Sequence, residues 1–129
     1  MGKMINFQHE AFTNTQKKYP KKICLIDGKK KYTYSQMENF SNKIANFLIK
    51  KGIKPNDKVC LLLDKNFYLY ASILGILKAG GCWVPLSKVF HYNRIFDLLD
   101  KVNPFFVICN QSNINIFKKK RLNILQIDS

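Results

Sequence analysis

The sequence lacks the segments that would place the protein in a membrane or outside the cell. It contains no uninterrupted apolar run of about 18 residues, the length that a transmembrane helix needs. Its start has neither the apolar stretch nor the small-residue cleavage site of a secretory signal, and Asn6 stands where a myristoylation signal has Ser or Thr. We therefore expect a cytoplasmic protein with no membrane partner.

Residue types that commonly carry catalysis or bind metals are scarce. The nucleophile motif G-x-S-x-G is absent, and the imidazoles are limited to His9 and His91, both near expected helix starts, where surface or capping roles are favoured. No cysteine pair has the C-x-x-C spacing of a metal or redox site. Since each cysteine lies in an apolar stretch, we expect buried free thiols at Cys24, Cys60, Cys82 and Cys109.

Acidic residues are also few, with 8 Asp and Glu against 22 Lys and Arg, and the net charge of +14 raises the hypothesis of a nucleic-acid partner. Only Arg94 and Arg121 are arginine, however, and sites that read phosphate or guanine favour the bidentate guanidinium group. The basic run at residues 118–121 is expected to be a solvated loop rather than a docking patch or a nuclear address. A nucleic-acid partner is therefore not favoured.

The hydrophobic content predicts one globular domain, since 47% of the residues are hydrophobic and 13% are aromatic. A first helix should carry Phe7, Ala11 and Phe12 on one face, and it should end before Pro20 because a residue that precedes proline is disfavoured in a helix. This helix is expected to dock on the rest of the domain.

A β-hairpin and a long helix are expected next. Residues 23–26 and 32–34 have the composition of short β segments, joined by an Asp-Gly turn that supplies positive backbone angles. Ser35 and Glu38 form an S-x-x-E capping box, which predicts the start of a helix that Gly52 closes.

From residue 58 onward, strand and helix patterns alternate. Continuous apolar runs predict strands that are covered on both faces, as in parallel sheets. The predicted order is a strand at 59–63, a buried helix at 67–78, a strand at 82–84, a helix around 92–99, a strand at 105–109 and a strand at 122–127. We therefore predict an α/β fold with an open, mainly parallel sheet and flanking helices.

In such sheets ligands bind beyond the carboxyl ends of the strands, which places a candidate site near residues 64–66, 86–88 and 110–112. The first of these turns has no glycine, so it lacks the backbone cradle of a dinucleotide fingerprint or a Walker loop. Asp64 could face a ligand, but a role in the turn or as a helix cap is favoured. Composition and spacing alone thus indicate no active site.

Three segments, in order and spacing, match the core motifs of one family. Residues 32–37 (YTYSQM) resemble its first core motif, T-Y-x-E-L. Residues 51–59 (KGIKPNDKV) resemble the family pattern G-x-x-P-G-D-x-V, with Asn56 in the second glycine position. Residues 76–86 (ILKAGGCWVPL) resemble the second core motif, L-K-A-G-x-x-Y-V-P-L-D-P, and the Ser-Lys that follows them replaces the final Asp-Pro. The chain resembles the N-terminal portion of the AMP-binding, adenylate-forming ligases, which include adenylation domains of nonribosomal peptide synthetases and acyl-coenzyme A synthetases.

The resemblance implies an enzyme family that activates an amino acid or a fatty or aryl acid with ATP and Mg. Its members form an acyl-adenylate and pass the acyl group to coenzyme A or to a carrier protein. The phosphate loop, ribose-binding aspartate and lid lysine of the family have no counterpart in residues 1–129. We therefore expect a partial AMP-binding N-terminal domain, assign it no catalytic, cofactor-binding or metal-binding residue, and expect no cofactor to bind to this chain alone.

Three hypotheses remain open. In the first, the chain is a fragment or split part of such a ligase, inactive alone, with unpaired sheet edges and a partner that is the missing remainder or a carrier protein. In the second, it is a stand-alone, non-catalytic α/β interaction module. The third, a basic nucleic-acid-binding protein, rests on the net charge alone.

Overall fold

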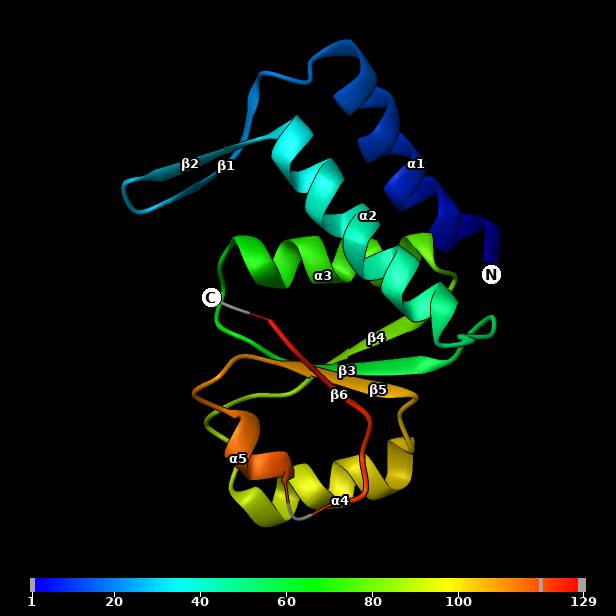
Figure 1. Cartoon of the computed structure of the whole chain (residues 1–129), viewed down its shortest axis with the longest axis vertical. Helices are drawn as coiled ribbons and strands as arrows, with labels where there is room; N and C mark the ends of the chain where they lie inside the picture. Colours follow the sequence, from blue (N-terminus) through cyan, green and yellow to red (C-terminus); the bar gives the residue numbers. More distant parts are fainter. Residues whose placement is uncertain (1, 119, 128–129) are drawn as a thin grey trace.

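The fold is a four-stranded sheet with helices on both faces, preceded by a helix and a β-hairpin (Figure 1). The computed structural model describes residues 2–118 and 120–127, with side chains described from Glu10 onward. The sheet order is β4-β3-β5-β6, and every neighbouring pair is parallel. The elements are α1 (Gly2–Lys18), β1 (Ile23–Asp27), β2 (Lys30–Thr33), α2 (Tyr34–Lys50), β3 (Lys58–Leu62), α3 (Phe67–Lys78), β4 (Cys82–Pro85), α4 (Tyr92–Val102), β5 (Phe106–Cys109), α5 (Ile114–Phe117) and β6 (Ile124–Gln126).

This topology confirms the predicted α/β class and the open, mainly parallel sheet. Each parallel connection carries a helix, with α3 between β3 and β4, α4 between β4 and β5, and α5 between β5 and β6. The short helix α5 was not predicted, because its four residues are too few to display a helical period. No helix within the described ranges is both long and apolar enough to cross a membrane.

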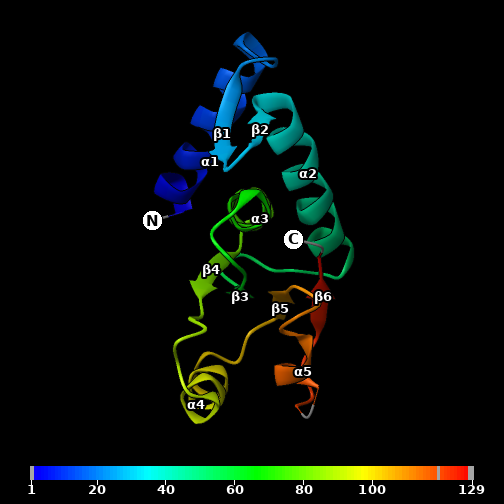
Figure 2. The ribbon, with the colours of Figure 1, turned by 90° about the vertical axis from the view of Figure 1, so that its left-hand side faces the viewer.

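The core lies on both faces of the sheet. Helices α2 and α3 cover one face, and α4 and α5 cover the other (Figures 1 and 2). Because β3 and β5 are inner strands, their side chains alternate between the two layers. The layer under α2 and α3 contains Val59, Leu61, Phe106 and Ile108, and the layer over α4 contains Cys60, Leu62, Val107 and Cys109. The prediction of strands covered on both faces is confirmed.

Helix α1 and the β1–β2 hairpin pack beyond α2 and α3, through a cluster centred on Met37, Phe67 and Ala71. Helix α1 ends at Lys18, before the proline, as predicted. The side chain of Phe7 lies outside the described residues. His9 lies well inside this helix, which begins at Gly2, so its predicted position near a helix start is wrong.

The start of α2 differs from the prediction. Thr33 is the N-cap: its side chain accepts a hydrogen bond from the Gln36 N–H at 3.2 Å, and the Gln36 side chain accepts one from the Thr33 N–H at 2.8 Å. The predicted capping box at Ser35 and Glu38 is therefore wrong. Thr33 ends β2 in an extended conformation, which an N-cap residue requires, whereas Ser35 already lies in the helix. The observed box occupies the T-x-x-E positions of the first core motif.

The hairpin turns at Gly28, which has a φ of +60°. Its strands pair up to Asp27 and Lys30, so the loop has two residues. The positive backbone angle falls on Gly28 and not on Asp27, because glycine has no Cβ to oppose it. The three lysines at 29–31 are exposed.

Candidate functional site

The turn that ends α3 carries the second core motif and shows why the motif glycine, Gly80, is needed. The Gly80 N–H donates to the Leu77 carbonyl at 3.0 Å, and the Gly81 N–H donates to the Ile76 carbonyl at 2.9 Å. These are the two bonds of a Schellman C-cap, with Gly80 in the left-handed region at a φ of +82°. The left-handed exit from this helix is confirmed.

The turn that ends α2 is built in the same way. The Gly52 N–H donates to the Ile49 carbonyl at 3.0 Å, and the Ile53 N–H donates to the Leu48 carbonyl at 3.1 Å. Farther along, Asn56 has a φ of +68° at the position where the family pattern has glycine. Asparagine tolerates the left-handed region better than most residues, so this departure from the pattern keeps the backbone shape.

The two turns bind each other at the amino ends of β3 and β4. The Asn56 N–H donates to the Gly80 carbonyl at 2.9 Å, and the Cys82 N–H donates to the Asp57 carbonyl at 2.8 Å. A Cβ on Gly81 would lie 3.1 Å from the Asp57 carbonyl oxygen, so a side chain would crowd this contact. The motifs therefore organise the edge of the sheet opposite to the one where parallel sheets bind ligands.

A largely buried ion pair joins α2 to α3. The Lys78 ammonium pairs with Glu38 and donates to Ser41 Oγ at 2.8 Å and to Asn42 Oδ1 at 2.9 Å. The Lys78 and Glu38 side chains are only 10% and 12% exposed. The lysine of the L-K-A-G motif therefore holds two helices together. Sequence reasoning missed this role because it assigned Glu38 to a helix cap, although a lysine at the end of an apolar helix was a signal.

The same two helices approach closely at Gly75. A Cβ on this residue would lie 2.7 Å from the Ile44 Cβ and 2.8 Å from the Ser41 carbonyl oxygen. Such distances are too short for non-bonded atoms, so the contact between α2 and α3 requires glycine at this position.

At the carboxyl ends of β3 and β4, where the fold rule predicts a ligand site, a cavity of about 460 Å³ opens. Lys88 Nζ lies 2.6 Å from Asp64 Oδ1, and this ion pair is about half exposed. It joins two of the three predicted turns. The cap of α3 is Asn66, whose Oδ1 accepts from the Tyr68 N–H at 3.0 Å, so Asp64 is not a cap. The apolar lining consists of Leu61, Leu63, Leu69, Pro85, Leu86 and Phe90.

The third predicted turn, at residues 110–112, does not line this cavity. Asn110 Oδ1 instead accepts hydrogen bonds from Ser112 Oγ at 2.8 Å and from the Asn113 N–H at 3.1 Å, which closes the turn on itself. His91 caps α4, since its Nδ1 accepts from the Asn93 N–H at 3.3 Å, and the predicted capping role of this histidine is confirmed.

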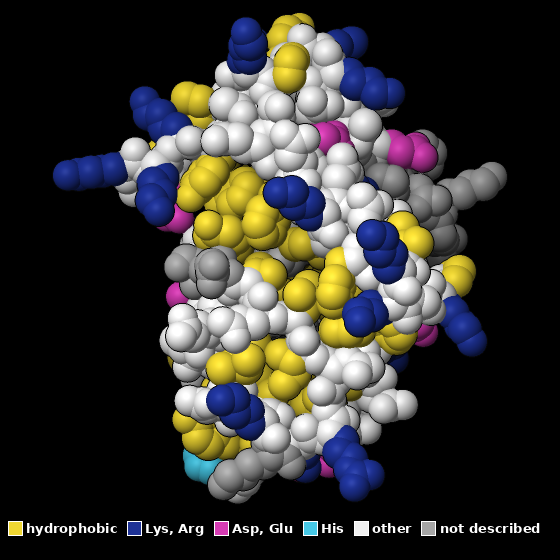
Figure 3. Space-filling model, viewed as in Figure 1, with side chains coloured by type: hydrophobic (Ala, Val, Ile, Leu, Met, Phe, Trp, Pro, Cys, Tyr) yellow, Lys and Arg dark blue, Asp and Glu magenta, His cyan; other side chains and the backbone are white. Residues whose placement is uncertain are grey.

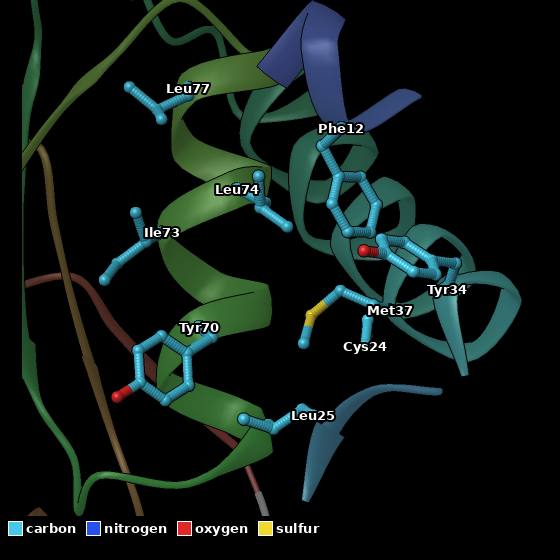
Figure 4. Close-up of a pocket in the computed structure, with 9 residues that line it drawn as sticks. All are labelled: Phe12, Cys24, Leu25, Tyr34, Met37, Tyr70, Ile73, Leu74 and Leu77. Atoms are coloured by element: carbon cyan, nitrogen blue, oxygen red, sulfur yellow. The ribbon is translucent and has the colours of Figure 1, made fainter. Parts of the chain in front are cut away.

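A second cavity, of about 370 Å³, lies between α1, β1, α2 and α3 (Figure 4). In Figure 4, Leu74 of α3 points across the gap toward the side where Phe12 and Met37 lie. Among the side chains that the structure describes, from Glu10 onward, no Asp, Glu, Lys, Arg or His lines this cavity, so its surface is mainly apolar. Its lining consists of Phe12, Cys24, Leu25, Tyr34, Met37, Tyr70, Ile73, Leu74 and Leu77.

All four cysteines are free. Burial raises the pKa of Cys60 and of Cys109 to about 11, because an apolar core disfavours the thiolate. The prediction of buried thiols is confirmed for these two. Cys24 and Cys82 are partly exposed, since β1 and β4 are edge strands, so the prediction is wrong for them.

The described residues do not fit the ATP and Mg that the family resemblance implies. At the carboxyl edge, Asp64 is already paired with Lys88, and the described ranges contain no group of three His, Cys, Asp or Glu that could hold a metal. The turn at 64–66 has no glycine through which backbone amides could approach a phosphate. No step of adenylation is therefore assigned to a residue of this chain.

The fold and the paired turns agree with a comparison of the whole sequence with protein families. The model of the AMP-binding enzymes matches residues 12–128. The chain belongs to this family, and it corresponds to the N-terminal part of an adenylation domain.

Curated relatives of the chain include several peptide-antibiotic synthases by name and a protein named as a nonribosomal peptide synthetase. The chain is 31% identical over 121 residues to a plipastatin synthase of Bacillus subtilis (strain 168), a match that covers 93% of this chain and 3% of that protein. It is 34% identical over 94 residues to gramicidin S synthase 2 of Brevibacillus brevis, covering 73% of this chain and 2% of that protein. The chain thus spans a few per cent of the length of these relatives.

Solved structures share the fold. A nonribosomal peptide synthetase, FmoA3, in a form bound to α-methyl-L-serine-AMP, matches with a TM-score of 0.85 at 23% identity, covering 92% of this chain and 14% of that chain. VinN matches with a TM-score of 0.85 at 19% identity, covering 92% of this chain and 31% of that chain.

Proposed function

We propose that this chain supplies the N-terminal scaffold of a ligase that activates an amino acid or a fatty or aryl acid with ATP and Mg, and that it is inactive alone. The position of the two motif turns, which are the turns after α2 and α3 that contain the family motifs, carries this proposal. Both turns lie at the amino ends of β3 and β4 and bind each other through backbone hydrogen bonds. The carboxyl edge presents a cavity whose Asp64 and Lys88 neutralise each other.

A partner polypeptide is supported by the edge of the sheet. β6 is the last strand in the sheet order, and its outer edge pairs with no strand in the described part of the chain. Beside it lies a groove of about 240 Å³, lined by Phe40, Lys43, Ile44, Phe47, Leu125 and Ile127. An open edge next to an apolar groove favours the addition of a further segment. We propose that the remainder of the ligase covers this edge, and that coenzyme A or a carrier protein accepts the acyl group.

Carboxylate-dependent ATP–pyrophosphate exchange tests the proposal. The purified chain, given Mg-ATP and a panel of amino, fatty and aryl acids, should give no exchange above the level without acid. Adding the polypeptide encoded downstream of codon 129 should produce exchange, and that polypeptide alone should not. Exchange by the chain alone would contradict its proposed inactivity, and no exchange by the pair would contradict the split-ligase function.

A stand-alone, non-catalytic interaction module is the second candidate. The observation that favours it is the inner pair of strands, whose apolar residues are covered on both faces within this chain. A module of this kind should be monodisperse and unfold cooperatively without a partner. A ligase fragment should aggregate, or should gain stability when the remainder is added.

A further inference from the structure

One end of the molecule, formed by the end of α1 and the β1–β2 hairpin, concentrates positive charge. Seven of the 22 basic residues of the chain fall within residues 17–31, with Asp27 as the one acidic residue of this stretch. Figure 3 shows Lys and Arg side chains around this upper end of the molecule, with hydrophobic side chains between them. The lysines are Lys17, Lys18, Lys21, Lys22, Lys29, Lys30 and Lys31, and all are exposed.

Large apolar side chains are exposed among these lysines. Tyr19 and Ile23 are each 48% exposed, and Ile26 is 63% exposed. The Lys22 ammonium lies 4.3 Å from the centre of the Tyr19 ring. Ile26 is paired directly with Lys31 across the hairpin. Exposed basic and apolar groups are therefore neighbours at this end of the molecule, which we call the basic hairpin surface and define as residues 17–23, 26 and 29–31.

The inner side of the hairpin explains why these groups stay exposed. Cys24, Leu25 and Tyr32 pack against the cluster between α2 and α3. The Tyr32 ring stacks on the Phe67 ring at a centroid distance of 4.2 Å. The hairpin is thus held by one face, and the opposite face is not needed for the core.

The expectation of no membrane partner rested on the lack of spanning, secretory and myristoylation segments, and it did not consider a basic surface. In contrast to it, we propose that the basic hairpin surface binds the surface of an anionic lipid bilayer. Lysine ammonium groups are attracted to the negative potential of acidic headgroups, and the exposed isoleucines and tyrosine are placed to enter the headgroup region. The surface contains no arginine, and its exposed apolar groups are mainly aliphatic. Nucleic-acid sites favour guanidinium groups and stacked aromatic rings, so the composition favours lipid over nucleic acid. The inference needs no ligase activity and is independent of the proposed function.

Vesicle co-sedimentation of the purified chain tests this inference. The chain should bind vesicles of equimolar phosphatidylserine and phosphatidylcholine and should not bind vesicles of pure phosphatidylcholine. Since each lysine near an anionic surface is worth about fivefold in affinity, changing Lys29, Lys30 and Lys31 together to Gln should weaken binding by up to about 100-fold. Added salt should weaken the binding of the unchanged chain as well.

Two further variants separate this surface from the overall charge. Changing Lys43, Lys54 and Lys101 to Gln removes the same charge from exposed positions elsewhere and should leave most of the binding intact. Changing Ile23 and Ile26 to Thr keeps β-branched residues in the strand and should weaken vesicle binding at unchanged charge. Circular dichroism must show that every variant is folded.

Three results would overturn the inference. The first is equal loss of vesicle binding in the two lysine triple variants. The second is full binding by the Ile23→Thr, Ile26→Thr variant. The third is retention on RNA or DNA that is stronger than vesicle binding and depends on residues 29–31, which would assign the surface to nucleic acid.

Discussion

Replacing Lys78 by Met should strongly destabilise the protein, because it leaves Glu38 as a poorly solvated charge. Met retains most of the apolar stem of Lys78 and removes the ammonium that binds Glu38, Ser41 and Asn42. Removing one partner of a buried pair costs about 3–5 kcal/mol. Because Glu38 is still 12% exposed, water can solvate part of its charge, and we expect a loss of about 2–4 kcal/mol in the free energy of unfolding.

Urea unfolding followed by circular dichroism measures this loss as a lower midpoint at constant slope. The double variant Lys78→Met, Glu38→Leu removes both charges and should recover a large part of the lost stability. The matched control is Lys88→Met, which breaks the half-exposed pair with Asp64 and should cost less than about 1 kcal/mol. Equal losses in the two single variants, or no recovery in the double variant, would refute the reasoning.

Three further predictions concern close packing, the backbone and the thiols. Gly75→Ala should lower the free energy of unfolding by about 1–3 kcal/mol despite the better helix propensity of Ala, because α2 and α3 must separate. Ser72→Ala in the same helix is the control, and equal denaturation midpoints of the two variants would contradict the prediction. Asn56→Gly should be neutral or stabilising by up to about 1 kcal/mol in thermal unfolding, because φ there is +68°; a marked loss of stability would count against it. Stability should fall as pH rises from about 9 toward 11. Cys60 and Cys109 ionise near their ordinary pKa of 9.0 in the unfolded chain, whereas burial raises their pKa to about 11 in the folded chain. Replacing both cysteines by Ala should flatten this pH dependence.

The strands and helices from residue 58 onward were predictable because burial restricts the residue types within a short stretch of sequence. The runs at 59–63 and 105–109 are apolar at every position, as strands covered on both faces must be. The start of α2 was less predictable, since both Thr33 and Ser35 are followed three residues later by Gln or Glu. The extended backbone at the end of β2 decided between the two capping boxes.

The candidate site could be predicted in outline and not in detail. The fold rule placed residues 64–66 and 86–88 at one edge of the sheet, and a cavity lies there. That Asp64 meets Lys88, and that residues 110–112 turn away from the cavity, depends on where each loop bends after its strand. Loop directions of this kind are not encoded in a periodic pattern.

By itself, the sequence determined the α/β class, the left-handed turns at Gly52 and Gly80, and the family, because periodicity and the backbone freedom of glycine are local properties. The tertiary structure alone decided that Lys78 pairs with Glu38, 40 residues earlier, and that the two motif turns bind each other. These contacts exist only when α3 packs on α2 and when β4 lies beside β3, because no short-range pattern brings such distant groups together.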